Sequence, residues 1–255
     1  MKKLRMLTVS FDTEIRPYQI PAFRGAFAHK VGLEHDWFHN HLNDFEPLPD
    51  RLDAYPSDSS FHYRYPLIQY KMDGARPMLL CLDEGVDQAH LFFSQPDWSM
   101  QIHGVEHEMN VDRMKVKQFN MQVWKHQFQY NLFKWQAFNS RNWQAYQEKQ
   151  GIVRQTQFLE RILRGHILGF ASGIGWEVED NIELAITAIK REKWVSFKRT
   201  KILTLDLSFQ TNVFLPEFVG LGKGVSKGFG VIRRPRRDGV QKNRVQREIK
   251  PRASR

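Results

Sequence analysis

Near its C-terminal end the chain carries a glycine-rich segment with five of the sixteen glycines, Gly220-Leu221-Gly222-Lys223-Gly224-Val225-Ser226-Lys227-Gly228-Phe229-Gly230. Two phosphate-binding motifs do not fit this segment. The Walker loop needs Ser or Thr where this chain has Gly224, and the dinucleotide fingerprint needs a glycine where it has Lys227. Two interpretations stay open: a turn that stabilises the last strand, or a loop whose amides and lysines approach a phosphodiester backbone.

Outward from this segment, the sequence alternates between predicted strands and helices. Strands are predicted at 4–11, 65–71, 78–82, 181–189 and 201–209, and helices at 21–30, 85–93, 141–150 and 156–168. Alternating apolar residues over 101–135 predict a long hairpin or meander. This order predicts an α+β fold of two sheet-and-helix units that meet near 137–141.

The positive charge is concentrated at the C-terminal end. The chain of 255 residues has 38 Lys and Arg against 28 Asp and Glu, a formal net charge of +10. Residues 233–255 hold ten basic and two acidic residues, so this tail carries +8 and the first 232 residues only +2. We expect a disordered basic tail with nonspecific affinity for polyanions, and a body whose cations gather in patches.

Composition excludes several classes of protein. Cys81 is the only cysteine, so one chain has neither an internal disulfide nor a cysteine-based zinc site, and we expect a reducing compartment. The N-terminal residues lack the apolar run of a signal peptide, and no apolar stretch approaches the roughly 20 residues of a membrane helix. We therefore expect a cytoplasmic protein without a membrane partner.

Two blocks of the sequence together resemble a known family. Phe214-Leu215-Pro216 followed by Gly220-Leu221-Gly222-Lys223 resembles the repeat-associated RNA-binding proteins of CRISPR systems, in particular the precursor-RNA endoribonucleases of the sixth Cas family. Three N-terminal blocks resemble the "b" subfamily: Phe23-Arg24-Gly25, His39-Asn40-His41 and Tyr63-Arg64-Tyr65-Pro66-Leu67-Ile68-Gln69-Tyr70-Lys71. The resemblance covers most of residues 1–232. The long linker between His41 and Tyr63 and the basic tail depart from the family pattern.

This resemblance implies two tandem ferredoxin-like modules of the βαββαβ type, residues 1–138 and 139–232, before the disordered basic tail at 233–255. RNA is expected to lie across both modules, gripped by the glycine-rich segment. Further basic residues alternate along predicted strands or cluster beside aromatic residues, as suits phosphate contact and base stacking, although a solvated strand face is the commoner explanation for either cluster taken singly. The expected RNA-binding residues are Arg24, Lys30, Lys115, Lys117, Lys198, Arg199, Gly220, Gly222, Lys223, Gly224, Ser226, Lys227 and Gly228.

Four of the ten histidines fall within residues 29–41, namely His29, His35, His39 and His41. They have three possible uses. Two of them with Asp36 or Asp44 could hold a metal, or local carbonyls could satisfy all four. They could instead serve as general acid and base in RNA cleavage without a metal, in which a 2′-hydroxyl attacks the neighbouring phosphate. We favour the third use, so no metal or cofactor is expected.

The resemblance implies a catalytic histidine in the His39-Asn40-His41 block and an assisting tyrosine in the Tyr63-Arg64-Tyr65 block. We expect His41 to act as general base or acid, with His39 as its close rival. Tyr63 ranks ahead of Tyr65 because Tyr65 precedes a proline and has a structural alternative. A cation on the preceding helix, Arg24 or Lys30, is expected to stand beside the phosphorane.

The sequence thus predicts an endoribonuclease that binds CRISPR repeat RNA and cuts precursor RNA without a metal, leaving 2′,3′-cyclic phosphate and 5′-hydroxyl ends. Other Cas effector subunits and a second copy of the chain are the other expected partners. A non-catalytic RNA-binding subunit of an effector complex is the alternative, and a metal-dependent nuclease is a third hypothesis.

Overall fold

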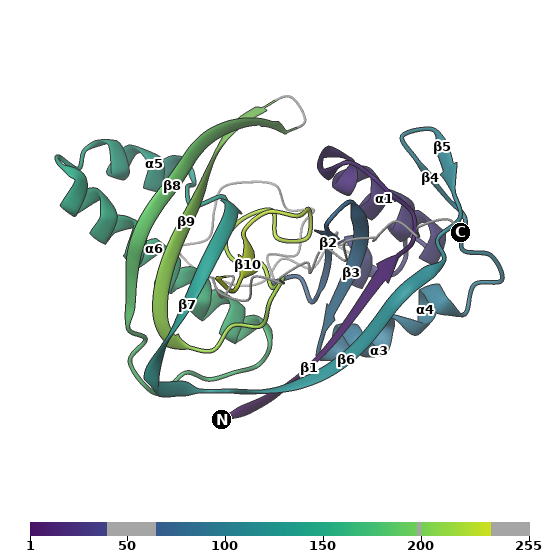
Figure 1. Cartoon of the computed structure of the whole chain (residues 1–255), viewed down its shortest axis with the longest axis horizontal. Helices are drawn as coiled ribbons and strands as arrows, with labels where there is room; N and C mark the ends of the chain where they lie inside the picture. Colours follow the sequence, from purple (N-terminus) through teal and green to yellow (C-terminus); the bar gives the residue numbers. More distant parts are fainter. Residues whose placement is uncertain (40–64, 198–199, 236–255) are drawn as a thin grey trace, which may run out of the picture.

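The computed structural model describes residues 1–39, 65–197 and 200–235. Its first half forms a four-stranded antiparallel sheet with helices on one side (Figure 1). The elements of this half are β1 (Lys2–Phe11), η1 (Pro17–Gln19), α1 (Ile20–Val31), α2 (Asp36–His39), β2 (Ile68–Asp73), β3 (Arg76–Leu82), α3 (Glu84–Gln88), α4 (His90–Phe93), β4 (Met100–Ile102), β5 (Val105–His107) and β6 (Val111–Met121). The short β4 and β5 pair only with each other.

The second half repeats this plan. Its elements are β7 (Val123–Trp135), α5 (Ser140–Gln147), α6 (Ile152–Gly173), β8 (Leu184–Phe197), β9 (Thr200–Val213) and β10 (Val231–Arg233). Helix α6 starts four residues before the helix predicted at 156–168, with Gly151 as its N-cap, and continues five residues beyond it, to Gly173. The glycine-rich segment lies between β9 and β10, and Figure 1 shows it between the two sheets.

The strand orders confirm two ferredoxin-like modules. The first sheet has the order β2-β3-β1-β6 and the second β10-β7-β9-β8. Each places the first strand of a module between its third and fourth strands, with the second strand at the edge, as a βαββαβ unit requires. In the second module, residues 214–230 stand where the other module has α3 and α4.

The chain changes sheet at Gln122, within the stretch that the sequence predicted to be one hairpin or meander. β6 pairs with β1, whereas β7 pairs with β9 and β10, so the predicted hairpin or meander over 101–135 is wrong except for the pairing of β4 with β5. Residues 123–135, assigned by the sequence to a first unit ending at 138, are a strand of the second sheet. Alternation along 101–135 fixed which residues share a face, but it carried no information about the pairing partner.

The two modules share a hydrophobic core. Alternate residues of β1 face opposite ways: Leu7 and Val9 pack with α1, whereas Leu4 and Met6 join the cluster formed by α6 and the second sheet. All four of these side chains are buried. Protein therefore packs on both faces of the first sheet along β1, which explains why apolar residues on both sides of this strand are buried.

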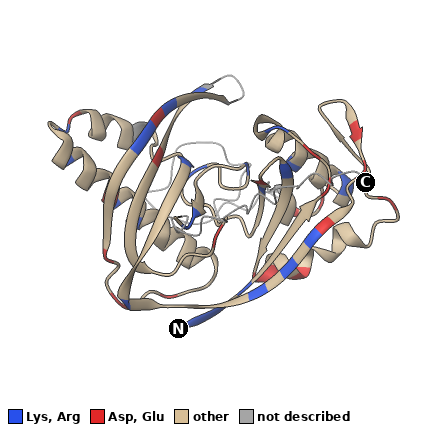
Figure 2. Ribbon diagram, in the orientation of Figure 1, with Lys and Arg blue, Asp and Glu red and all other residues tan. Residues whose placement is uncertain are grey.

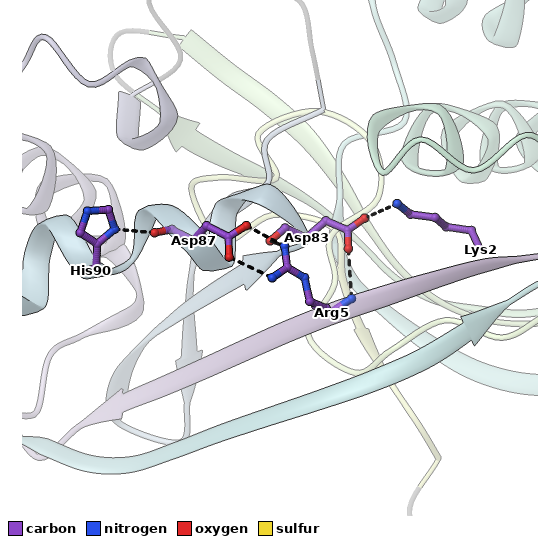
Figure 3. A network of polar contacts seen from close by, with 5 residues as sticks. All are labelled: Lys2, Arg5, Asp83, Asp87 and His90. Atoms are coloured by element: carbon purple, nitrogen blue, oxygen red, sulfur yellow. Dashed lines mark hydrogen bonds and ion pairs between the residues drawn. The ribbon is translucent and has the colours of Figure 1, made fainter.

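A polar network ties the start of β1 to α3 (Figure 3). The Asp83 carboxylate accepts the Arg5 backbone amide at 3.1 Å and lies 2.9 Å from Lys2 Nζ. Arg5 also pairs with Asp87 at 2.6 Å, and His90 contacts the Asp87 carbonyl. Asp83 has φ +45°, which L-residues rarely adopt, so the network holds a strained turn between β3 and α3.

Candidate nucleic-acid interface

The glycine-rich segment packs closely against both modules. Gly222 has φ +90°, and a Cβ there would stand 2.8 Å from the Gln136 carbonyl oxygen. Gly228 has φ +82°, and its Cβ would stand 3.3 Å from the Cγ2 atom of Ile20 on α1. Glycine at these two positions permits both the backbone turn and the close approach.

Many amides of this segment bond to the protein itself, contrary to the expectation of many free N–H groups. The donors are Gly220, Leu221, Lys223, Lys227, Phe229 and Gly230. The two ends of the segment pair with each other in an antiparallel way. The Leu221 amide donates to the Gly230 carbonyl, and Gly220 forms a β-bridge with Val231, the first residue of β10. The segment therefore does stabilise the last strand, one of the two sequence interpretations.

Strand β2 and the residues just before it hold the segment from the first module. The Tyr65 hydroxyl donates to the Gly220 carbonyl at 2.8 Å, and the Gly220 amide donates to Gln69 Oε1 at 3.1 Å. Lys71 Nζ donates to the Val225 carbonyl at 2.8 Å. These three side chains, which we call the β2 clamp, connect residues more than 150 positions apart and dock the segment on the first sheet.

Burial perturbs the ionisable members of the clamp. Lys71 is fully buried, and burial lowers its pKa from 10.5 to about 7. Burial likewise raises the pKa of Tyr65, although its hydrogen bonds with Gln69 and Gly220 oppose this shift. The Tyr65 hydroxyl both donates to Gly220 and accepts from Gln69 Nε2 at 2.8 Å, which gives it a positioning role. Its catalytic role stays a prediction.

A half-buried histidine of the second module lies near the segment. Trp135 Nε1 donates to His166 Nδ1 at 3.1 Å, which assigns the proton of a neutral imidazole to Nε2. Burial and, next, the charge of Lys223 lower the pKa of His166 to about 4. Burial also lowers the pKa of Lys223. His166 is thus a neutral structural acceptor beside the segment, a role that the sequence analysis missed.

A basic groove runs between the first sheet and residues 214–218. Lys115 and Lys117 share one face of β6, as predicted, and pair with Thr8 and Met6 of β1. The groove has a volume of about 360 Å³, and its charged lining residues are Arg113, Lys115, Lys117, Arg233, Arg234, Asp73 and Glu217. Cations outnumber acids in this groove by five to two. Blue segments of the β6 ribbon in Figure 2 mark the positions of Lys and Arg along this strand.

Two of these cations belong to the fold, although the sequence placed them in the tail. Arg233 is the last residue of β10, and its guanidinium lies over the Phe218 ring at 3.6 Å. Arg234 follows and lies over Phe214 at 5.0 Å. The disordered tail, predicted from 233, therefore does not begin there, and residues 236–255 lie outside the described part of the chain.

The two cations predicted on α1 have protein partners. Lys30 Nζ pairs with Asp97 at 2.6 Å, and this hydrogen bond lowers the pKa of Asp97 to about 2. Arg24 is partly buried close to Tyr70, and burial lowers the pKa of its guanidinium. Lys30 thus ties α1 to the loop before β4. The predicted role of these two residues beside the phosphorane stays a prediction.

The predicted catalytic block starts at the end of α2. His39 is the last residue of this helix, and the neighbouring Phe38 stacks on Phe27 of α1, with ring centroids 5.8 Å apart. The Tyr70 hydroxyl donates to the Phe38 carbonyl at 3.3 Å. Strand β2 therefore contacts both the glycine-rich segment and the start of the histidine block. The predicted residues His41, Tyr63, Lys198 and Arg199 lie outside the described residues.

Two family models match the chain. The Cas6b N-terminal domain matches residues 2–48 and 50–120, and the Cas6b C-terminal domain matches residues 107–235. The chain belongs to the Cas6b family. This assignment confirms the family resemblance of the glycine-rich segment and the N-terminal blocks, and it covers nearly all of the described fold.

Two solved structures share this fold, and one further protein shares part of the sequence. The solved structure described as "Crystal structure of Cas6b" has a TM-score of 0.77 and 22% identity, covering 92% of this chain and 100% of that one. The CRISPR RNA processing endoribonuclease Cas6b structure has a TM-score of 0.66 with the same identity and coverage. Uncharacterized protein MJ0978 of Methanocaldococcus jannaschii is 30% identical over 98 residues, 38% of this chain and 65% of that protein. This match thus spans less than two thirds of that protein's length.

Two further properties concern metals and membranes. Within residues 1–39, 65–197 and 200–235, no group of three or more His, Cys, Asp or Glu side chains could hold a metal ion. No helix in these ranges is long and apolar enough to cross a membrane.

Proposed function

We propose that this Cas6b protein binds CRISPR repeat RNA and cuts the precursor RNA within each repeat. The observation that carries the proposal is the basic groove between the modules, beside the clamped glycine-rich segment. Five cations there suit the phosphates of one RNA strand, and the glycine-rich segment brings two further lysines, Lys223 and Lys227. The family assignment and the likeness to a CRISPR RNA processing endoribonuclease support the same proposal.

The cleavage that we propose needs only protein groups and the RNA itself. The 2′-oxygen attacks the adjacent phosphorus, forming the O2′–P bond, and the P–O5′ bond breaks. A general base takes the proton of the 2′-hydroxyl, and a general acid gives a proton to the departing 5′-oxygen. The products are a 2′,3′-cyclic phosphate and a 5′-hydroxyl, so no water and no cofactor is consumed.

We assign the general acid or base role to His41, with His39 as its rival for that role and Tyr63 as the assisting hydroxyl. The anchoring of Phe38 by the Tyr70 hydroxyl supports this assignment, because it fixes the start of the histidine block beside β2. The same strand also holds the glycine-rich segment, so β2 contacts both the segment that we expect to bind RNA and the start of the histidine block. A cation beside the phosphorane, Arg24 or Lys30, stabilises the charge that develops during attack.

The test uses repeat RNA from the neighbouring array, incubated with the whole protein in EDTA. We expect cleavage in EDTA, mass-spectrometric detection of a 2′,3′-cyclic phosphate, and no cleavage when the scissile 2′-hydroxyl is replaced by hydrogen. His41→Ala should cut at a single-turnover rate at least 100-fold below that of the wild type, because a general acid or base typically contributes roughly 100- to 10,000-fold. His35→Ala, a histidine nearby in sequence, is the matched control.

Three results would contradict parts of this proposal. A requirement for added divalent ions would refute the metal-free step. Wild-type cleavage by His41→Ala would move the acid or base role to His39. Tight binding of repeat RNA without cleavage under any condition would favour a non-catalytic RNA-binding subunit. A homodimer and contacts with other Cas subunits stay predictions, to be tested by sedimentation and by co-purification.

A further inference from the structure

A second cavity lies between the modules, at the N-terminal end of α1. It has a volume of about 500 Å³, within the roughly 300–1,000 Å³ typical of small-molecule sites. Residues from η1, α1, β2, β7, β8, the glycine-rich segment and β10 line it. The residues that matter here are Tyr18, Pro21, Met72, Phe133, Lys134 and Lys227. None of its described lining residues is acidic.

Strand β7 is distorted so that two consecutive residues face this cavity. Between Leu132 and Trp135 the pairing with β9 gains one residue, a β-bulge, so Leu132 and Trp135 both point into the core and are fully buried. Phe133 and Lys134, which would face opposite ways in a regular strand, both line the cavity. The bulge thus brings an aromatic residue and a lysine into the lining of one cavity.

The bulge is held by a specific contact. Lys134 has φ +50°, in the left-handed region that non-glycine residues rarely adopt. Its backbone amide donates to the Asp206 carboxylate on β9 at 2.7 Å. A backbone conformation that is unfavourable by itself, and fixed by a side chain of the neighbouring strand, is often associated with a functional site.

The aromatic walls of the cavity are exposed to solvent. Tyr18 is 65% exposed and Phe133 is 39% exposed, although both are large hydrophobic side chains. Unpaired nucleobases stack on exposed aromatic rings of this kind, while lysines contact the phosphate that joins them. An aromatic and apolar cavity lined by lysines, with no acid among its described lining residues, suits one nucleotide of an RNA strand.

We propose that this cavity binds one unpaired nucleotide of the RNA strand, with the base between Tyr18 and Phe133 and the phosphate at Lys134 and Lys227. This proposal rests on the proposed function and names a subsite for it. The cavity lies at the start of α1, and the histidine block begins where Phe38 stacks on Phe27, seven residues further along this helix, a rise of about 10 Å.

The test measures stacking directly. The probe is a 12-nucleotide single-stranded RNA with one central 2-aminopurine, a base whose fluorescence falls when it stacks on an aromatic ring. We expect the whole wild-type protein to quench this fluorescence on binding. Phe133→Ala should remove the quenching and weaken binding by about 5- to 150-fold, the range for loss of one base–aromatic stack. Phe133→Trp should restore both.

Charge at the subsite is tested with Lys134→Met. This variant should weaken binding and reduce the slope of log affinity against log salt by about 1, because one phosphate contact is lost. Ile152→Ala and Lys149→Met, which change side chains of the α5–α6 region outside the cavity, are the matched controls and should bind as the wild type does. Thermal melting of each variant checks that it folds.

The results that overturn the subsite differ from those that overturn the proposed function. RNA binding by the wild type without quenching, or Phe133→Ala binding as tightly as the wild type, refutes the subsite. A change in sedimentation on Phe133→Ala would show that a second copy of the chain covers the cavity, which also refutes it. Cleavage of repeat RNA by the wild type is measured separately: quenching without cleavage refutes the proposed function and leaves the subsite in place.

Discussion

The buried lysine of the β2 clamp makes a specific prediction about stability and pH. Lys71 is fully buried, and its Nζ donates to the Val225 carbonyl of the glycine-rich segment. Burial lowers its pKa from 10.5 to about 7. In the unfolded chain the ammonium group keeps its proton up to about pH 10.5, whereas in the folded protein it releases the proton above about pH 7. Lys71→Met removes this titration while keeping an unbranched side chain of similar length.

The pKa difference sets the size of the effect. Between about pH 7 and pH 10.5 the unfolded state holds one proton more than the folded state, so folding becomes more favourable as pH rises. The gain is about 1.4 kcal/mol per pH unit, or about 5 kcal/mol over the whole interval. Below pH 7 both states are protonated, and the contribution of Lys71 is constant. The Met variant lacks this gain but also leaves the Val225 carbonyl without its donor, a loss that is the same at every pH.

The assay is urea denaturation of the wild type and Lys71→Met at pH 7.5, 8.5 and 9.5. The free energy of unfolding of the wild type minus that of the variant should rise by about 3 kcal/mol over these two pH units. Cys81 and the buried tyrosines titrate in both proteins, so the subtraction cancels them. Lys125→Met, at an exposed position of β7, is the control and should give a flat difference. A flat difference for Lys71→Met as well would refute the assigned burial of this cation.

Three further predictions concern the fold and the tail. Gly222→Ala should lower the melting temperature more than Gly104→Ala. Both glycines have positive φ, but at Gly222 a carbonyl oxygen stands 2.8 Å from the added Cβ, a clash that typically costs about 1–3 kcal/mol more. Equal melting temperatures would contradict this. Asp83→Ala should lower the free energy of unfolding, measured in urea, by about 1–3 kcal/mol, because a backbone amide and a lysine lose their acceptor. Asp87→Ala, at the exposed ion pair in Figure 3, should change this free energy little. A larger loss for Asp87→Ala than for Asp83→Ala would contradict the prediction. Deletion of 236–255, which carries a net charge of +6, should reduce the slope of log RNA affinity against log salt by up to about 4 and leave cleavage intact; loss of all cleavage would show that these residues belong to the catalytic body.

Local sequence patterns predicted much of the fold. The alternating run at 4–11 and the helix at 21–30 correspond to β1 and α1, and 201–209 falls within β9. These elements carry strong periodicity and recognisable ends, which are properties of neighbouring residues. The shared face of Lys115 and Lys117 was predictable for the same reason, since alternation in a strand needs no partner to be read.

Strand pairing was predicted less well. Residues 101–135 alternate throughout, yet β6 and β7 separate at Gln122 into different sheets. Nothing in the alternation distinguishes a hairpin from two strands that pair with distant partners. The bulge at Lys134 was equally invisible, because its cause is the contact with Asp206, a residue 72 positions away. The candidate site was therefore predicted as a set of residues, without the groove, clamp and cavity that arrange them.

The sequence by itself determined the α+β composition, the family blocks and a glycine-rich segment where the chain must turn and approach other atoms closely. Only the tertiary structure decided what that segment touches. Gln69 and Lys71 alternate with apolar residues in β2, so by pattern they belong to an exposed face, but both are fully buried. The reason is that residues 220–226 of the second module cover that face and accept or donate its hydrogen bonds. Periodicity in a strand tells which side chains share a face, and only the arrangement of distant segments decides whether water or protein covers it.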